Sequence, residues 1–151
     1  MKIAENITIN NFQTKIENTP LGVSKFILDK TYTTSWSNKG KIYVIKAKKG
    51  FEWDGATIPR SLWSIIGYYP TGIMLAASLW HDLIYVQKGL IYNLYEEKEE
   101  FVSRKHCDQL FYAHMLKSGV DKKAAKTMYQ TIRVFGRFYW SDFSDFNPFK
   151  K

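Results

Sequence analysis

The stretch of residues 73–86 (IMLAASLWHDLIYV) constrains the fold most, because it is apolar on nearly every side over about four turns of helix. A helix on a protein surface has one polar face, and this stretch has none. Ser78, His81 and Asp82 interrupt it, and it is shorter than the about 20 residues that a membrane span needs. We therefore expect a helix buried in the middle of the protein.

The residues before this helix have the composition of β-strands. Residues 25–36 and 41–48 are rich in β-branched and aromatic residues, and residues 37–40 (SNKG) predict a turn between them. Residues 7–12 predict a third strand, followed by a turn at residues 19–22 (TPLG). We expect an antiparallel hairpin or a small sheet in this part of the chain.

The residues from 59 onwards have a helical period. Residues 60–66 predict a short helix, Ser103 caps a helix that runs to about Lys117, and Asp121 caps another that runs to Phe135. Residues 87–102 are expected to form a polar connection, with the run at 96–100 (EEKEE) as a solvated loop or helix end. The predicted class is α+β, with an N-terminal antiparallel β hairpin or small sheet and then a bundle of three to four helices around a buried central helix.

The length of 151 residues is that of one ordinary domain. Within a single domain 1–151, residues 1–50 are β-rich, residues 59–137 are helical, and residues 138–151 form an aromatic tail that could wrap the domain or bind a partner. The N-terminus lacks the apolar core of a secretory signal, and the single cysteine, Cys107, excludes an intramolecular disulfide.

The net charge of +8 favours polyanionic partners, but its distribution weakens that inference. Lys46 and Lys48 alternate with apolar residues as on a solvated strand face, and Lys122, Lys123 and Lys126 open a helix that is apolar on its other side. No nucleic-acid-binding module accompanies them, so solvated faces are favoured over a nucleic-acid site. Only four arginines occur beside 18 lysines, which draws attention to Arg60, Arg104, Arg133 and Arg137 as partners of buried carboxylates.

A candidate site lies within the predicted buried helix. Burying a carboxylate is costly unless it is paired, so His81 and Asp82 require partners there. Tyr85 follows His81 by one helical turn and shares its side of the helix. If the next helix packs antiparallel, its Asp108, one turn after Arg104, and Asp54 from the loop before the helices could converge on this pair.

Two interpretations of these residues are open. In the first, His81 is a general base for water, and Asp82 holds calcium, magnesium or manganese, with Asp54 as a further ligand. In the second, Asp82 and Asp108 pair with Arg60 or Arg104 in a buried structural network. His106, His114 and Cys107 are less favoured as ligands or nucleophiles, because spacing places the two histidines on different sides of any pocket and no Cys-His-Asn arrangement occurs.

The order of these motifs resembles the phage and prophage domain-of-unknown-function family 1353. The resemblance rests on Gly50-Phe51-Glu52-Trp53-Asp54-Gly55-Ala56-Thr57-Ile58-Pro59-Arg60, Leu62-Trp63, Ala76-Ala77, His81-Asp82-Leu83-Ile84-Tyr85, Ser103-Arg104, Asp108, Phe111-Tyr112, Met115, Gly119, Tyr129, Arg133 and Phe135-Gly136. It covers about residues 40–140 and implies a phage or prophage origin, with no established activity. The cytoplasm of the bacterial host or the phage virion is then the expected location.

The layout is also similar, more distantly, to that of the secreted His-Asp phospholipases. That resemblance would make His81 the base, Asp82 a calcium ligand, Tyr85 a supporting hydroxyl and Asp108 the carboxylate that orients the imidazole. The chain departs from those enzymes in having no disulfides and no clear glycine-rich calcium loop.

Two functions are therefore carried forward. The first is a small metal-dependent hydrolase that acts on a lipid or cell-envelope bond. The alternative is a non-enzymatic virion component or accessory protein, whose partner is a phage structural protein or a host protein and in which the His-Asp pair is structural. Nucleic-acid binding through the basic ends ranks third.

Overall fold

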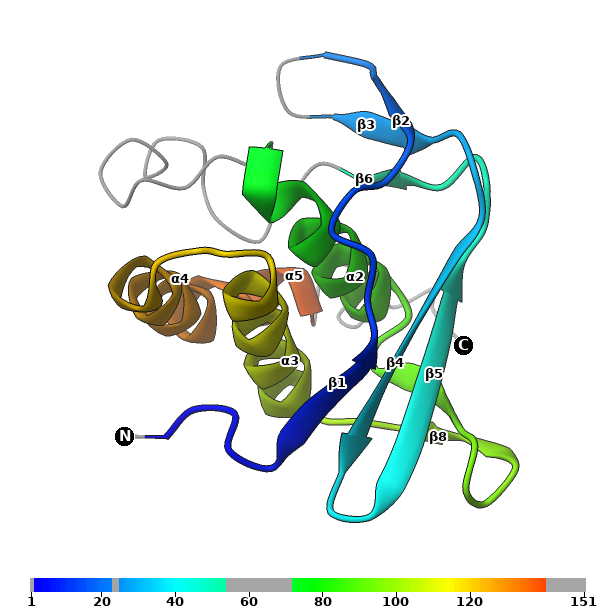
Figure 1. Ribbon diagram of the computed structural model, residues 1–151, viewed down its shortest axis with the longest axis vertical. Coiled ribbons are helices and arrows are strands. Elements are labelled where there is room, and N and C mark those ends of the chain that lie inside the picture. The colour runs from blue at the N-terminus through cyan, green and yellow to red at the C-terminus, as the bar shows by residue number, and fades with distance from the viewer. Residues whose placement is uncertain (1, 23–24, 54–71, 141–151) are drawn as a thin grey trace, which may run out of the picture.

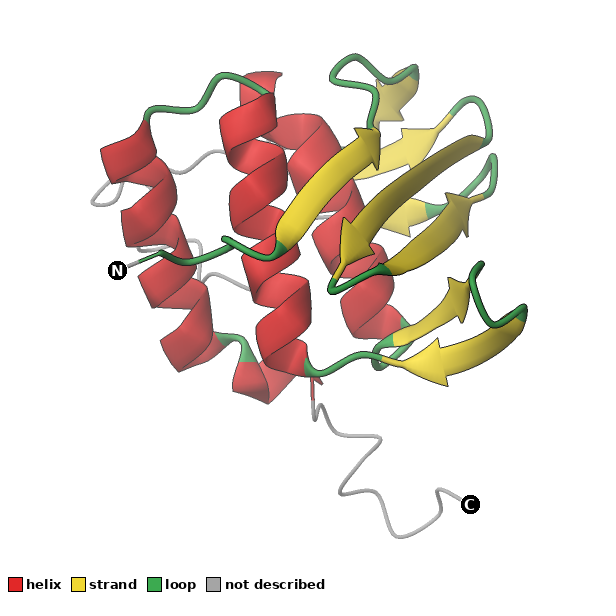
Figure 2. Ribbon diagram, turned by 60° about the horizontal axis from the view of Figure 1, so that its bottom comes forward, coloured by secondary structure: helices red, strands yellow, loops and turns green. Residues whose placement is uncertain are grey.

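The structure is a computed structural model, and the residues described are 2–22, 25–53 and 72–140. Helices form one layer and strands the other, as Figure 2 shows. The strands come largely first in the chain and the helices follow, so the predicted α+β class is confirmed.

The larger sheet has five antiparallel strands (Figure 1). Their order in the sheet is β1 (Ile7–Asn11), β4 (Tyr32–Asn38), β5 (Lys41–Ala47), β7 (Leu90–Asn93) and β8 (Lys98–Phe101). β4 (Tyr32–Asn38) and β5 (Lys41–Ala47) form the predicted hairpin. Its turn is shorter than expected. Ser37 and Asn38 belong to β4 and pair with residues of β5, so only Lys39 and Gly40 connect the strands. Both turn residues have positive φ, 50° and 82°, as a two-residue hairpin turn requires. The predicted third strand is confirmed as β1 (Ile7–Asn11), which pairs with β4.

A second, three-stranded sheet corrects two predictions. It consists of β2 (Asn18–Pro20), β3 (Phe26–Leu28) and β6 (Glu52–Trp53) in the order β2-β3-β6. The turn expected at residues 19–22 is wrong in its first half, because Thr19 and Pro20 belong to β2; proline is tolerated there because β2 is an edge strand. The single strand expected over residues 25–36 is two strands, β3 and β4, which belong to different sheets.

The polar connection expected at residues 87–102 is also wrong, because it folds into a hairpin. β7 (Leu90–Asn93) pairs with β5 on one side and with β8 (Lys98–Phe101) on the other. The acidic run therefore supplies the turn and an edge strand of the larger sheet. The side chains of Ile91 and Asn93 are buried under the hairpin.

The predicted central helix is confirmed. A short 3-10 turn, η2 (Gly72–Met74), leads into α2 (Leu75–Val86), in which every residue from Ala76 to Tyr85 is buried. One side of α2 packs against the sheets in a core that includes Trp36, Trp53, Leu79, Trp80, Ile84 and Leu110.

The last helices begin and end where their caps predict. α3 (Arg104–Lys117) starts after Ser103, whose hydroxyl accepts a hydrogen bond from the backbone N–H of His106, and α4 (Lys122–Phe135) starts after Asp121. With α2 they enclose a second core that contains Ala77, Phe111, Met115, Met128 and Ile132. A short helix, α5 (Arg137–Trp140), follows.

Two predicted segments lie outside the described residues: the helix at 60–66, and the aromatic tail beyond residue 140. Among the helices that the structure describes, none has the length and hydropathy needed to cross a bilayer.

Candidate functional site

The carboxylate of Asp108 is the centre of the candidate site. Asp108 lies on the second turn of α3, and its side chain has no exposed surface. A buried carboxylate is stable only when hydrogen bonds and opposite charges replace its hydration. Four side chains, drawn from all three long helices, do so here.

One oxygen of Asp108 faces α2. His81 Nε2 lies 2.8 Å from Asp108 Oδ1, and the Tyr85 hydroxyl donates to the same oxygen at 2.7 Å. The helices α2 and α3 are antiparallel. Tyr85, at the end of α2, contacts Arg104 at the start of α3, whereas His81, earlier in α2, contacts Phe111, which lies later in α3. The predicted antiparallel packing thus brings His81, Tyr85 and Asp108 together.

The other oxygen of Asp108 faces two guanidinium groups. Arg133 Nη1 from α4 lies 2.7 Å from Oδ2, and Arg104 Nη1 lies 3.3 Å from it. Arg104 also donates to the carbonyl oxygens of Ile132 and Arg133, in the last turn of α4, where helical carbonyls lack partners within the helix. Arg104 has the supporting role that the sequence predicts, and Arg133 is a partner that spacing alone did not assign.

The hydrogen bonds of this network fix the positions of its protons. A carboxylate can only accept, so His81 Nε2 donates the hydrogen bond to Asp108 Oδ1. Burial and the neighbouring Asp108 carboxylate raise the pKa of Tyr85 far above its ordinary value. At neutral pH the Tyr85 hydroxyl is therefore protonated and donates to Asp108.

Cys107 lies beside the same pair, with its Sγ 3.9 Å from the carbonyl oxygen of His81. Ligand atoms of His81, Cys107 and Asp108 lie within 4.8 Å of one another. Burial and the Asp108 and Asp82 carboxylates raise the pKa of the Cys107 thiol, and two guanidinium groups already neutralise Asp108. A carboxylate that is already paired with two arginines is a poor metal ligand, so this trio does not favour a metal ion.

Asp82 follows His81 directly on α2. Its side chain is buried, with 8% of its surface exposed, and it acts electrostatically on Cys107. The other two predicted members, Asp54 and Arg60, lie outside the described residues. The structure thus unites His81, Tyr85, Asp108 and Arg104, while the calcium, magnesium or manganese site assigned to Asp82 and Asp54 stays a prediction.

The two remaining histidines have different surroundings. His106 faces the sheet, where the Trp36 indole donates to its Nε2 at 2.9 Å, and the side chain of Asn38 lies 3.3 Å from its Nδ1. His114 has no exposed surface and stacks on Phe12, with ring centroids 4.3 Å apart. Within the described chain, neither ring nitrogen of His114 has a hydrogen-bond partner. Neither histidine contacts Asp108.

Gly136 closes the network from the end of α4. A Cβ atom at this position would collide with the Tyr85 hydroxyl oxygen, and it would lie 2.5 Å from the Ile132 carbonyl oxygen and 3.0 Å from Arg104 Nη1. No larger residue fits without moving the donors of Asp108.

We therefore expect Gly136→Ala to lower the free energy of unfolding by about 1–3 kcal/mol, as overpacking in a core does. Urea unfolding at neutral pH measures the change. Gly22→Ala is the matched control, because a Cβ at Gly22 would meet no atom within 4 Å. Equal stabilities of the two variants would contradict the tight packing of Gly136 on Tyr85.

Comparisons with known proteins assign a family but no activity. The model of a family described as protein of unknown function (DUF1353) matches residues 29–132, which is more than half of the chain. The matched range includes His81, Asp82, Tyr85, Arg104 and Asp108. No curated protein and no solved structure matches the chain.

Proposed function

We propose that His81 and Asp108 form the general-base pair of a small hydrolase. The chain belongs to the DUF1353 family of proteins of unknown function. The observation that carries this proposal is the 2.8 Å contact of His81 Nε2 with Asp108 Oδ1, together with the Tyr85 hydroxyl on the same oxygen. A carboxylate that orients a histidine through one ring nitrogen is the arrangement in which the other nitrogen acts as a general base.

The chemistry follows from the proton positions. His81 Nδ1 would take a proton from a water molecule as that water attacks an ester or amide carbonyl. Asp108 would then stabilise the imidazolium through Nε2. Tyr85 and the two arginines are positioning residues in this scheme, because they fix the Asp108 carboxylate and touch no substrate.

A divalent cation held by Asp82, with Asp54, would polarise the carbonyl under attack. Carboxylate oxygens suit calcium, magnesium or manganese. A lipid or cell-envelope bond is the proposed substrate class, and the similarity to the His-Asp phospholipases supports it at the level of motif order. A phage or prophage origin, which the family resemblance implies, would assign such an activity to entry, lysis or interference with the host, in the host cytoplasm or the virion.

One observation favours the non-enzymatic alternative. Asp108 is fully buried, and both of its oxygens are occupied by donors from α2, α3 and α4. A network of this kind also joins helices in proteins that have no catalytic site. In that case the chain is a virion component or accessory protein that binds a phage structural protein or a host protein.

Calorimetric titration with calcium, magnesium, manganese and zinc separates the hydrolase from the non-enzymatic alternative. The titration is carried out on the wild type and on Asp82→Asn. We expect one of the oxygen-preferring ions to bind, and Asp82→Asn to weaken that binding at least tenfold. Asp29→Asn is the control, because Asp29 is an exposed carboxylate that accepts only from Thr19 within the described chain.

The ion that binds is then included in ester and peptidoglycan hydrolysis assays of the wild type and His81→Gln. Loss of hydrolysis in a folded His81→Gln protein is the expected result. Absence of binding for all four ions would reject the metal-dependent hydrolase. Equal hydrolysis by wild type and His81→Gln would reject His81 as the base.

A further inference from the structure

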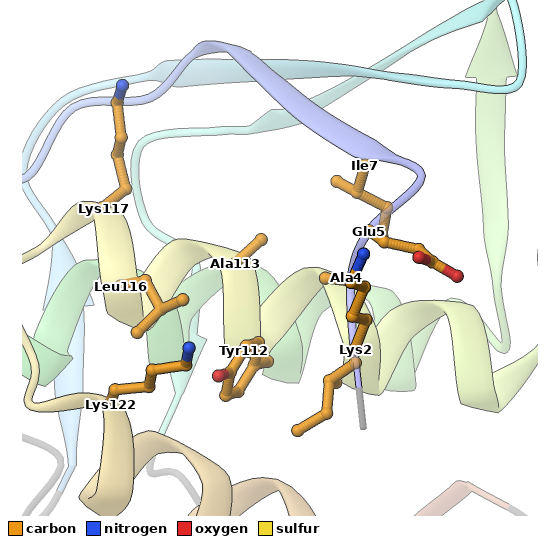
Figure 3. A pocket seen from close by; sticks show the side chains of 10 residues that line it. Lys2, Ala4, Glu5, Ile7, Tyr112, Ala113, Leu116, Lys117 and Lys122 are labelled. Carbon is orange, nitrogen blue, oxygen red and sulfur yellow. The ribbon is translucent and has the colours of Figure 1, made fainter.

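A hollow of about 530 Å³ lies on the opposite side of α3 from its contact with His81, where no residue of the proposed hydrolase site takes part. It is bounded by the N-terminal segment, by α3 and by the start of α4, and Figure 3 shows its lining. This volume is in the range of small-molecule sites. The residues that line it are Lys2, Ile3, Ala4, Glu5, Ile7, Tyr112, Ala113, Leu116, Lys117 and Lys122.

The floor of the hollow is apolar. Tyr112, Ala113 and Leu116 lie side by side on α3, between the N-terminal segment and the two lysines at the far end (Figure 3). Tyr112 is held from behind by an edge-on contact with Tyr129, whose ring centroid is 6.1 Å away. Leu116 keeps 39% of its surface exposed, although it lies in a concave and largely apolar site. An apolar group in the hollow would cover it.

The rim of the hollow is cationic. Lys117 and Lys122 stand at one end and Lys2 at the other, and Glu5 is the single acid among the lining residues. Within the described part of the chain, none of these four residues forms an ion pair, although other lysines do. The net charge of the lining is therefore +2, and this charge is uncompensated around a low-dielectric floor.

The field of a neighbouring hollow adds to this charge. A second, more polar hollow of about 290 Å³ lies on the other side of the N-terminal segment and shares Lys2 and Glu5 with the first. Lys39 and Lys105 line it as well. Five lysines thus surround the segment, which raises the local concentration of small anions near both hollows.

We propose that the hollow between the N-terminal segment and α3 binds a small anionic amphiphile, with its apolar part on Tyr112 and Leu116 and its anionic group at Lys117 and Lys122. The apolar floor and the unpaired cations are both needed for this assignment. A floor without cations would take a neutral ligand, and cations without a floor would take a free phosphate. An alkyl phosphate and the headgroup region of an anionic lipid share the required chemistry.

The test uses n-hexyl phosphate as the probe, titrated calorimetrically into the full chain, with inorganic phosphate and hexanol as comparisons. We expect hexyl phosphate to bind at least tenfold more tightly than either, because it uses both parts of the site. Binding of inorganic phosphate as tight as that of hexyl phosphate would overturn the proposal, and so would an absence of binding.

Two variants locate the binding. Lys117→Glu/Lys122→Glu should weaken hexyl phosphate binding at least tenfold, and Leu116→Asp should do the same through the floor. Lys46→Glu/Lys48→Glu is the matched control, since it makes the same change in net charge at exposed positions of the β5 region and should change the affinity less than twofold. Equal weakening by both double variants would show unspecific attraction and reject the site.

Vesicles distinguish the two sources of the ligand. Recruitment to vesicles of phosphatidylglycerol and phosphatidylcholine that is lost in Lys117→Glu/Lys122→Glu would assign the site to a lipid. Binding of hexyl phosphate without recruitment would assign it to a soluble anion. Both results support the proposed chemistry, and neither depends on the hydrolase proposal, because His81 and Asp82 do not line the hollow.

Discussion

Replacing Asp108 with alanine is expected to lower the free energy of unfolding by about 3–5 kcal/mol, the cost of removing one partner from a buried charge network. The substitution leaves the guanidinium groups of Arg104 and Arg133, with 17% and 30% of their side chains exposed, without their shared carboxylate. His81 and Tyr85 lose the acceptor of their hydrogen bonds as well. A loss of this size is a large part of the total stability of an ordinary domain.

Urea unfolding followed by circular dichroism measures this loss. Asp29→Ala serves as the control and should change the free energy of unfolding by less than about 0.5 kcal/mol, as exposed substitutions usually do. A loss below about 1 kcal/mol in Asp108→Ala would mean that the network contributes little to the helix packing. The expected instability is also the reason why His81→Gln, and not a change at Asp108, tests the proposed catalysis.

Mild acid is expected to destabilise the protein through His106 and His114. Burial lowers the pKa of His106 to about 4, although Glu100 partly opposes the shift, and burial with the nearby His81 lowers the pKa of His114 to about 3. Both rings are neutral in the folded protein, whereas an unfolded histidine has a pKa of about 6.5. Below that value the unfolded chain binds more protons than the folded one, so stability falls as the pH falls.

The structural cause differs between the two rings. The Trp36 indole can only donate, so His106 Nε2 must accept, and protonation of His106 breaks that contact. His114 has neither exposed surface nor a hydrogen-bond partner in the described chain, so a charge on its ring would be neither hydrated nor paired. This stabilisation is complete above pH 6.5 and is lost progressively towards pH 4 for His106 and pH 3 for His114.

Between pH 7 and pH 5 each histidine should lower the free energy of unfolding by about 2 kcal/mol, or the two together by about 4 kcal/mol. Urea unfolding at a series of pH values gives the slope of the free energy of unfolding against pH. His114→Phe, which keeps a ring against Phe12, should reduce the slope between pH 6 and pH 5 by about one proton, or about 1.4 kcal/mol per pH unit. An unchanged slope in this variant would exclude His114 as a source of the acid sensitivity.

The helices were predictable because their signals are local. Ser103 and Asp121 cap α3 and α4 at the predicted positions, and the uniform hydropathy of residues 73–86 marks a helix that is buried all round. Each of these signals depends on side chains within one turn of the helix or on composition alone.

The β7–β8 hairpin could not be predicted in the same way. β8 is an edge strand whose residues, Lys98–Phe101, have no apolar face, so the acidic run has the composition of a solvated loop. Its turn contains Glu97 with φ of 53°, where sequence rules expect glycine or asparagine. Pairing with β7 and β5, which is a tertiary property, determines its conformation.

The candidate site was predictable up to the packing of α4. Helical spacing places Tyr85 with His81 and Arg104 with Asp108, and an antiparallel helix pair is enough to bring the two sets together. Arg133 and Gly136 join the site from a third helix, and their position depends on how α4 crosses α3. Two sequence signals singled out Arg133: the scarcity of arginine and the resemblance to the DUF1353 family.

The pairing of β5 with β7 determines the order in which the parts of this chain can fold. Tyr43 lies opposite Asn93 and Val44 opposite Tyr92, although the chain passes through β6 and α2 between them. Contacts between residues so distant in sequence close a large loop, and loop closure slows folding. The β4–β5 hairpin and the α3–α4 pair are local and can form early. Completion of the larger sheet is therefore expected to be the slow step, and it cannot occur during synthesis until β8 has left the ribosome.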